Sequence, residues 1–208
     1  MNFPKIRTNL TKVYDGLAEY WGTDKTLHDW GQDDLVKFAK LVGKGAKVLD
    51  LGCASGYQSQ LLKDLGLKVV GLDLSPKMIA AAKKLVPKAK FLVGDMTEMD
   101  FADRSFDGVY ARASLLHAPK KLVPKVLKSV HKVLKDNGIF YLAVKEGQGE
   151  EEVDDERHGI KVKRFFSFFT GSEITKFLED TGFTVKSVTF YLRTGGTTNW
   201  IKVFARKN

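Results

Sequence analysis

The middle of the chain alternates between short apolar runs and segments with helical periodicity, and this alternation constrains the fold more than any other feature. Short apolar runs are typical of buried strands, and strands that alternate with helices favour a parallel sheet covered on both faces. We therefore predict a doubly wound α/β fold. The expected strands are Lys47–Leu51, Lys68–Asp73, Ala89–Val93, Phe106–Ala111 and Gly138–Val144, and the expected helices are Gln58–Leu65, Pro76–Leu85 and Lys121–Leu134.

The two ends of the chain follow other patterns. Apolar residues at helical spacing predict two helices within residues 8–42, separated by a loop. After Val144 a polar, acidic stretch comes before a different order of elements. These are Arg164–Phe169, a helix over Ser172–Thr181 and two strands, Thr184–Leu192 and Trp200–Arg206, with Gly195 and Gly196 between them as a hairpin turn.

A single domain is expected, because no internal repeat or linker-like segment interrupts the 208 residues. Within it we distinguish an N-terminal helical cap (1–45), a core (46–145) and a C-terminal part (146–208) that contains a lid loop, a helix and a hairpin.

Composition limits the compartment and the partners. The formal net charge of +9 on its own favours nucleic acid, but the excess is scattered lysine without an Arg-rich run or RNA-binding motif. The first 20 residues lack the apolar segment of a signal peptide, and no run approaches the ~18 residues of a membrane span. Cys53 is the only cysteine. We expect a cytosolic protein with no membrane partner and no metal site, and we do not favour nucleic acid.

The segment Val48-Leu49-Asp50-Leu51-Gly52-Cys53-Ala54-Ser55-Gly56-Tyr57 is a strand that runs through small residues into a helix. Small residues at a strand's carboxyl end let a ligand approach the backbone, and doubly wound sheets bind ligands there. A dinucleotide-binding loop would need glycine at positions 54 and 57, where the chain has Ala54 and Tyr57. The loop therefore favours a ligand without phosphates, and Asp50 suits a cationic group; a tight turn that binds nothing is the alternative.

Two further acids follow the next two strands. Asp73 comes 21 residues after Gly52, where a carboxylate accepts hydrogen bonds from ribose hydroxyls. Asp95 follows the third strand, where it would accept from an adenine amino group beside Met96. A single acid is more often a cap or turn former. Three acids at three consecutive strand ends together predict an adenosine with a cationic tail.

With these features the chain resembles the class I S-adenosylmethionine (SAM)-dependent methyltransferases. The matching segments are VLDLGCASG (48–56), VVGLDLSPKMI (69–79), FLVGDMTEMDF (91–101), FDGVYARASLLHAP (106–119) and LKDNGIFYLAV (134–144). Ala54 departs from the family's usual glycine. The resemblance implies SAM as cofactor and a Rossmann-like, seven-stranded, mostly parallel sheet with an antiparallel last strand, helices on both faces and an N-terminal helical lid.

The resemblance also implies roles for individual residues. Asp50, Gly52, Ala54 and Gly56 would flank the methionyl part of SAM; Asp73 would hold the ribose, with Leu74 and Met78 against the adenine; Asp95 and Met96 would meet the adenine amino group; Ala111 and Arg112 would lie under the sulfonium; and Tyr14 and Tyr20 would close the pocket.

His117 is the candidate general base, because it stands where the family often meets its substrate and a histidine titrates near neutral pH. The alternative is a loop histidine with no proton to move. Arg112 would grip an anionic group of the acceptor, or instead the SAM carboxylate. Cys53 is interpreted as a small packed residue.

Two variable segments should shape the acceptor pocket. One is Trp21–Trp30. The other is Glu146–Arg164, which contains two acidic clusters and leads to four phenylalanines, Phe165, Phe166, Phe168 and Phe169. Its functional interpretation is a mobile lid with an acidic mouth that favours a cationic or amine acceptor. Its structural interpretation is a solvated loop followed by core aromatics, which we favour for the phenylalanines.

We therefore predict a SAM-dependent methyltransferase with a small-molecule acceptor. A tRNA or protein methyltransferase is the first alternative, although no Asn-Pro-Pro-Tyr segment follows the fourth strand. A non-catalytic protein that binds SAM or a nucleotide is the second. A nicotinamide oxidoreductase is weakened by Ala54 and Tyr57.

Overall fold

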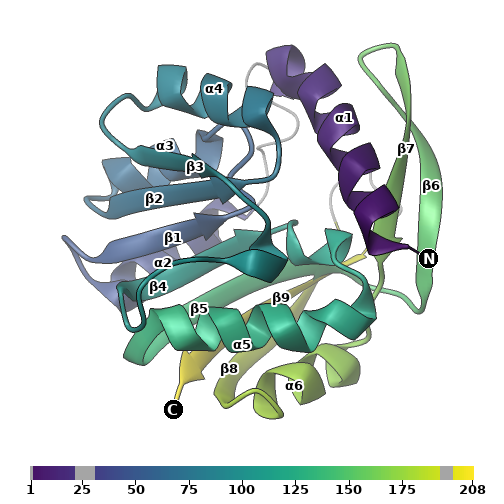
Figure 1. The fold of residues 1–208 in the computed structure, drawn as a ribbon. Helices are drawn as coiled ribbons and strands as arrows, with labels where there is room; N and C mark the ends of the chain where they lie inside the picture. The colour runs from purple at the N-terminus through teal and green to yellow at the C-terminus, as the bar shows by residue number, and fades with distance from the viewer. Residues whose placement is uncertain (1, 22–30, 193–198) are drawn as a thin grey trace.

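The structure is a computed structural model that describes residues 2–21, 31–192 and 199–208. Within these residues the strands form a seven-stranded sheet in the order β3-β2-β1-β4-β5-β9-β8 and a separate two-stranded sheet, β6-β7 (Figure 1). The strands of the large sheet are β1 Lys47–Leu51, β2 Lys68–Asp73, β3 Lys90–Val93, β4 Phe106–Arg112, β5 Leu134–Lys145, β8 Phe183–Leu192 and β9 Asn199–Lys207. The helices are α1 Phe3–Trp21, α2 Gln32–Val42, α3 Tyr57–Asp64, α4 Pro76–Leu85, α5 Val123–Val133 and α6 Gly171–Glu179.

The sheet confirms the predicted topology. Strands β1 to β5 pair in parallel, while β9 runs antiparallel to both β5 and β8. The chain leaves β1 towards β2 on one side and later returns to place β4 on the other. The carboxyl ends of β1 and β4 therefore flank the point where the strand order reverses, which is where open α/β sheets bind ligands.

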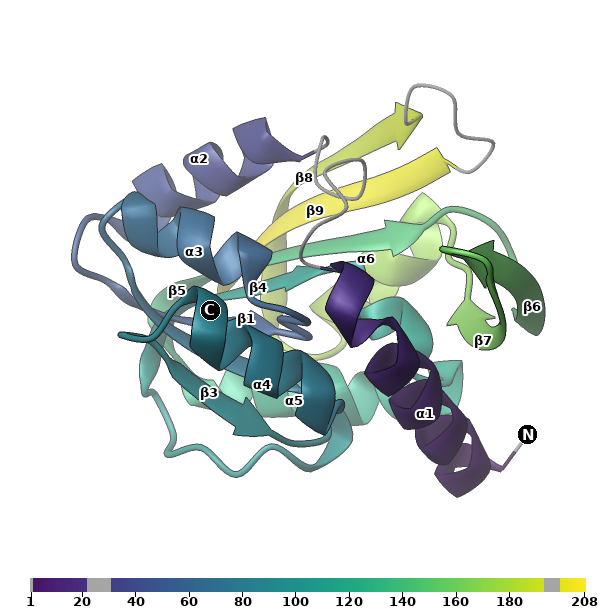
Figure 2. The same cartoon turned by 90° about the horizontal axis from the view of Figure 1, so that it is seen from above.

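Helices cover both faces of the sheet (Figures 1 and 2). On one face α2 and α3 bury Phe38 and Leu62 against Val48, Val69 and other strand residues. On the other face α5 and α6 pack against the opposite side chains of the same strands. The apolar stripe of α5 explains its place, because its buried residues recur every three or four positions: Val123, Val126, Leu127, Val130 and Val133.

Helix starts follow the local sequence. Helix α4 begins at Pro76, as predicted, and Ser75 caps it by accepting a hydrogen bond from the Met78 amide at 3.0 Å. Thr170 caps α6 by accepting from the Glu173 amide at 3.1 Å. These caps define the residue at which each helix begins.

Two regions differ from the sequence prediction. The acidic stretch expected as a loop is a β-hairpin, with β6 over Glu150–Arg157 and β7 over Ile160–Ser167. Strand β5 also begins four residues before the expected start at Gly138, with an irregular first part in which Asn137 has φ of +63° and the register with β4 shifts. Other boundaries agree to within a few residues.

Helix α1 lies apart from the sheet and packs against α4 and β7 (Figure 1). Its buried side chains Val13 and Leu17 contact Met78 of α4 and Val162 of β7. The expected segment Trp21–Trp30 lies outside the described residues beyond Trp21, as do Gly195 and Gly196. No helix among the described residues is long and apolar enough to cross a membrane.

Candidate active site

A cavity lies at the carboxyl ends of β1, β2 and β4 and is bordered by α1 and the β6–β7 hairpin. Its volume is about 230 Å³. One water molecule needs only roughly 10–15 Å³ of such volume, so this cavity accommodates a ligand of many atoms. Its position is the one predicted from the strand order.

The loop after β1 forms one wall. Gly52 lines the cavity with φ of +79°, and a Cβ there would lie 2.2 Å from Ser114 Cβ, so the wall requires glycine. Ala54 also lines the cavity, and its amide donates to Asp73 Oδ2 at 2.9 Å. Gly56 does not line it, contrary to the prediction. Gly56 instead lets α3 approach α4, because a Cβ there would lie 2.9 Å from Ala82 Cβ.

Asp50 lies beneath this loop rather than on the cavity wall, which corrects its expected position. The carboxylate is 3% exposed and accepts a hydrogen bond from the Ser59 hydroxyl of α3 at 2.6 Å. Burial raises the pKa of Asp50 to about 7, despite the hydrogen bond from Ser59. The side chain points to the face that α3 covers, because alternate residues of a strand face opposite sides of the sheet.

The other two acids line the cavity as predicted. Asp73 accepts the Ser75 amide on Oδ1 and the Ala54 amide on Oδ2, each at 2.9 Å, and burial raises its pKa. Asp95 accepts the amide and hydroxyl of Thr97 on Oδ1 at 2.8 Å. Asp95 Oδ2 is buried without a hydrogen bond in the described chain, although Arg7 Nη1 lies 3.5 Å away.

Several predicted neighbours of these acids also line the cavity, while others do not. Leu74, Met96 and Arg112 are on its wall. Met78 is fully buried beneath α1, because it faces that helix from α4. Ala111 is fully buried within β4, and Ala113, in a left-handed conformation just beyond it, lines the cavity instead.

Tyr14 and His117 meet at the end of the cavity away from Asp95. His117 Nδ1 lies 2.8 Å from the Phe165 carbonyl, which only accepts, so Nδ1 carries the proton. His117 Nε2 then accepts from the Tyr14 hydroxyl at 2.6 Å, and Arg164 Nη1 donates to the same hydroxyl at 3.3 Å. Burial lowers the pKa of His117 to about 3, so the imidazole is neutral.

Tyr20 does not border the cavity, which corrects its expected role. Its side chain is 40% exposed and stacks on His158 of the hairpin turn, with ring centroids 4.9 Å apart. Six positions separate it from Tyr14, so the two side chains leave α1 on different faces. Trp21, seven positions after Tyr14, shares its face and lines the cavity.

The β6–β7 hairpin presents cations to the cavity, contrary to the acidic mouth expected there. Arg157 and Arg164 line the cavity, whereas the acidic side chains of β6 do not. Asp155 forms ion pairs with both arginines, including a short contact to Arg164 Nη2. Phe165, Phe166 and Phe169 are buried, which confirms them as core aromatics, and Phe166 also lines the cavity.

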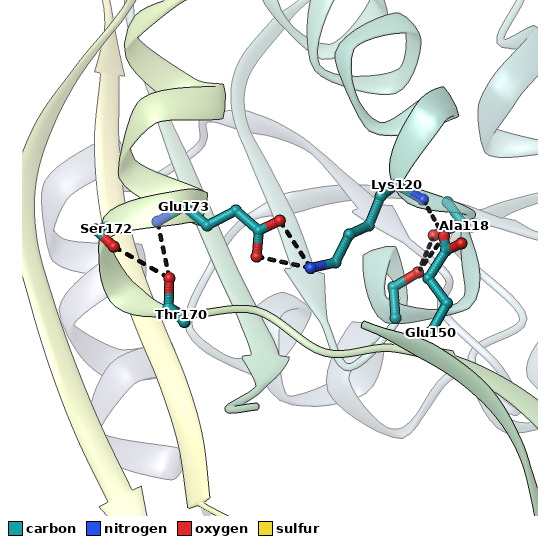
Figure 3. Close-up of polar contacts among 7 residues, drawn as sticks. Ala118, Lys120, Glu150, Thr170, Ser172 and Glu173 are labelled. Atoms are coloured by element: carbon teal, nitrogen blue, oxygen red, sulfur yellow. Dashed lines mark hydrogen bonds and ion pairs between the residues drawn. The ribbon is translucent and has the colours of Figure 1, made fainter. Parts of the chain in front are cut away.

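A polar cluster ties the hairpin base to the loop that carries His117 (Figure 3). Lys120 Nζ lies 2.7 Å from both carboxylate oxygens of Glu173, and its amide donates to Glu150 Oε1 at 2.5 Å. The Ser167 hydroxyl donates to the Ala118 carbonyl at 2.8 Å. The cluster holds the loop after β4, the hairpin and α6 in one arrangement.

Sequence reasoning did not identify Lys145, Arg157 and Trp200 as cavity residues. One signal for the hairpin was present. Residue types alternate on either side of His158-Gly159 in the sequence, which is typical of two strands joined by a two-residue turn. In the structure both turn residues have positive φ. Lys145 and Trp200 pair across β5 and β9, and only the sheet register brings them together.

Comparisons with known proteins agree with this geometry. Residues 49–142 match the family described as "Methyltransferase domain". The chain is 38% identical over 101 residues to an uncharacterised methyltransferase of Synechocystis sp., which covers 49% of this chain and 48% of that protein. It is 33% identical over 151 residues to the 2-methyl-6-phytyl-1,4-hydroquinone methyltransferase of the same organism, and this match covers 62% of this chain and 47% of that protein. The chain thus spans about half the length of these curated relatives.

A solved structure has the same fold. The 1,6-didemethyltoxoflavin-N1-methyltransferase of Burkholderia thailandensis, crystallised with 1,6-didemethyltoxoflavin and S-adenosylhomocysteine, superposes with a TM-score of 0.76 at 22% identity. The match covers 97% of this chain and 87% of that chain. At this identity the likeness shows the fold alone. Residues 49–142 thus match a methyltransferase domain, and the fold around them is the one that the resemblance implied.

Proposed function

We propose that this protein binds SAM in the cavity and transfers its methyl group to a small-molecule acceptor. The observation that carries the proposal is the pair of carboxylates at consecutive strand ends, Asp73 and Asp95, beside the Gly52–Ala54 loop in one cavity. A cofactor with ribose hydroxyls, an adenine amino group and no phosphate matches these groups.

The wall fits SAM at the atoms that would hold it. Asp95 Oδ2 is buried without a hydrogen bond in the described chain, so an adenine amino group would supply its missing donor. Asp73 is held by two backbone amides, and its remaining lone pairs would accept the ribose hydroxyls. Leu74 and Met96 would contact the adenine, while Gly52 and Ala54 would flank the methionyl part.

Bound SAM supplies a methyl group on a sulfonium, and the protein's contribution is to hold the acceptor in line with it at near-attack distance. A lone pair of the acceptor forms the new bond to carbon as the carbon–sulfur bond breaks with its electrons going to sulfur. Where the acceptor atom carries a proton, that proton would pass to solvent water. Arg112 and Ala113, at the end of β4, would lie on the sulfonium side of the cavity.

For His117 we infer a positioning role rather than the expected role of general base. Both ring nitrogens already have partners, and burial keeps the imidazole neutral with a pKa of about 3. Proton removal at neutral pH favours a base with a pKa near 7. The imidazole instead fixes the direction of the Tyr14 hydroxyl, which Arg164 also contacts.

A small acceptor is supported by the confinement of the cavity, which α1 and the hairpin border on two sides. The named relatives act on a hydroquinone and on 1,6-didemethyltoxoflavin, which are small molecules. A buried, single cysteine supports the cytosol as the compartment. The tRNA or protein methyltransferase and the non-catalytic SAM-binding protein remain the alternatives to test.

Calorimetric titration with S-adenosylhomocysteine tests the cofactor site. Asp73→Asn and Asp95→Asn should each weaken binding tenfold or more, a loss of about 1.4 kcal/mol, because each removes a charged acceptor. Asp103→Asn, at an exposed position far from the cavity lining, is the matched control. Equal affinities in all folded variants would overturn the assignment.

Methyl-labelled SAM then tests the acceptor class. The protein is incubated with separate small-molecule, tRNA and protein fractions of a cell extract. We expect label in the small-molecule fraction. Label confined to tRNA or protein would replace the acceptor class, and binding of S-adenosylhomocysteine without any transfer would favour the non-catalytic alternative.

A further inference from the structure

Cationic and aromatic side chains line the part of the cavity beside β5, β9 and the hairpin, across β1 and β4 from the strand ends that carry Asp73 and Asp95. Tyr14 comes from α1, Lys145 from the end of β5, Arg157 and Arg164 from the hairpin, and Trp200 from β9. Phe166 lies among them. We call this part of the cavity the cationic end. If SAM occupies the strand ends near Asp73 and Asp95, the acceptor enters here.

Arg164 is buried and only partly satisfied. Its side chain is 7% exposed; Nη2 pairs with Asp155 and Nη1 donates to Tyr14, but Nε has no hydrogen bond in the described chain. Arg157 shares the same carboxylate, with Nε 3.0 Å from Asp155 Oδ2. One carboxylate on the hairpin therefore serves two guanidinium groups.

Lys145 adds a third cation without an acidic partner. Its ammonium lies 3.7 Å from the centroid of the Phe166 ring, and the described residues give it no ion pair or hydrogen bond. The Arg164 guanidinium lies over the same ring at 4.9 Å. Burial, followed by repulsion from Arg164, lowers the pKa of Lys145 to about 8, and Asp155 and Glu151 of β6 oppose this shift. An unpaired cation in a cavity is costly unless a ligand completes its interactions.

The chemistry of the acceptor inferred below rests on the proposed function. We propose that the acceptor is a small molecule with a carboxylate or phosphate group, which Lys145 and Arg164 bind at the cationic end of the cavity. Lysine and arginine form strong charge-assisted hydrogen bonds to such oxyanions. The apolar or aromatic body of the acceptor lies along Phe166 and Trp200, with its reacting atom towards Ala113 and the sulfonium.

This specificity is the reverse of the one expected from the acidic clusters in the sequence. Those acids lie on β6 outside the cavity lining, and two of them stand opposite basic residues of β7 across the hairpin, Asp154 opposite Lys163 and Glu156 opposite Lys161. Three cations of this region therefore line the cavity, while the acidic partner of the two arginines, Asp155, lies outside the lining.

Binding of ring compounds with different charges tests the proposal. The protein is first saturated with S-adenosylhomocysteine and then titrated calorimetrically with 4-hydroxybenzoate, phenyl phosphate, 4-hydroxybenzyl alcohol and tyramine. We expect one or both anions to bind at least about tenfold more tightly than the alcohol and the amine, a difference of about 1.4 kcal/mol. The two anions distinguish a carboxylate site from a phosphate site. Equal binding of the alcohol, or no binding of either anion at millimolar concentration, would overturn the proposal.

Variants of Lys145 test the residue assignment. Lys145→Met should weaken the anion about tenfold and leave the affinity for S-adenosylhomocysteine unchanged, whereas Lys145→Arg should retain the anion. Lys128→Met, on an exposed part of α5, is the matched control. Arg157→Met, at a more exposed side chain of the same end, is a second variant and should also weaken the anion.

The outcomes separate this inference from the proposed function. Failure of the unmodified protein to bind S-adenosylhomocysteine would remove the proposed function itself. Normal cofactor binding with no preference for anions, or with no effect of Lys145→Met, would overturn only the acceptor chemistry. A parallel loss of cofactor and anion affinity in Lys145→Met would mean that Lys145 serves the cofactor's carboxylate, which also contradicts the proposal.

Discussion

The substitution Gly52→Ala separates the two demands that the loop after β1 places on its glycine. The backbone at Gly52 has φ of +79°, a conformation that costs an L-residue roughly 1–2 kcal/mol. The added Cβ would also lie 2.2 Å from Ser114 Cβ and 3.5 Å from its Cα, so the loop after β4 must move. Forcing a methyl group into a packed site costs typically about 1–3 kcal/mol. The variant should therefore lose about 2–5 kcal/mol of unfolding free energy.

Urea unfolding of a double-mutant cycle measures these two parts. Removing the Ser114 side chain in Gly52→Ala/Ser114→Gly relieves the steric part but not the backbone part, so we expect a coupling of about 1–3 kcal/mol between the two sites. Gly16→Ala is the control, because a Cβ there meets nothing within 4 Å and the position is helical. That change should stabilise the protein by roughly 0.5–1 kcal/mol. If the unfolding free energy lost by the double variant equals the sum of the losses of the two single variants, the contact between Gly52 and Ser114 is refuted.

Three further predictions concern buried charge and the hairpin base. The pKa of Asp50 is raised to about 7, so its stabilisation is present below about pH 4 and is lost as pH rises through 7. In thermal unfolding, the stability of Asp50→Asn relative to the unmodified protein should therefore be higher at pH 8 than at pH 4. The pKa of His117 is lowered to about 3, so its stabilisation is present above pH 6.5 and is lost as pH falls towards 3. His117→Asn should reduce this fall of unfolding free energy with pH, to which one group contributes at most about 1.4 kcal/mol per pH unit. An unchanged fall in the variant would contradict the neutral imidazole. Glu173→Gln breaks the partly exposed ion pair with Lys120 and should cost about 0.5–1.5 kcal/mol in urea unfolding. Asp103→Asn, in a largely exposed pair with Lys132, should cost nothing measurable.

The sequence predicted the core of the fold because its signals are local. Strands β1 and β2 and helix α4 lie where the apolar runs and the helical periodicity indicated. Alternation of strands and helices then determined the parallel order, since such connections allow few topologies. The position of Asp73 and Asp95 on the cavity followed from the strand ends alone.

Site details failed where a neighbour from elsewhere in the chain decides the outcome. Asp50 and Gly56 belong to the same motif as Gly52, yet α3 covers the first and α4 packs on the second. Met78 is hidden because α1 lies over α4. These contacts join segments far apart in the chain, and no local pattern records them.

The acidic segment failed for a different reason. The acidic residues of this segment were interpreted without considering which strand they pair with. The alternation of residues 150–167 about His158-Gly159 indicates a hairpin. Pairing places Lys163 and Lys161 of β7 opposite Asp154 and Glu156 of β6. Because side chains alternate along a strand, Arg157 and Arg164 share the other face of the hairpin, and both line the cavity. A net count of charges in one segment therefore gave the wrong sign for the site.

Thermal unfolding with and without SAM, S-adenosylhomocysteine and NAD tests the central claim most directly. At about 100 times its dissociation constant, a ligand that binds only the folded chain adds about 2.7 kcal/mol. For a domain of 208 residues this raises the melting temperature by roughly 5–10 °C. We predict such a rise with SAM and with S-adenosylhomocysteine and none with NAD. No rise with either sulfur ligand, or a rise with NAD alone, would contradict the assignment of the cavity to SAM.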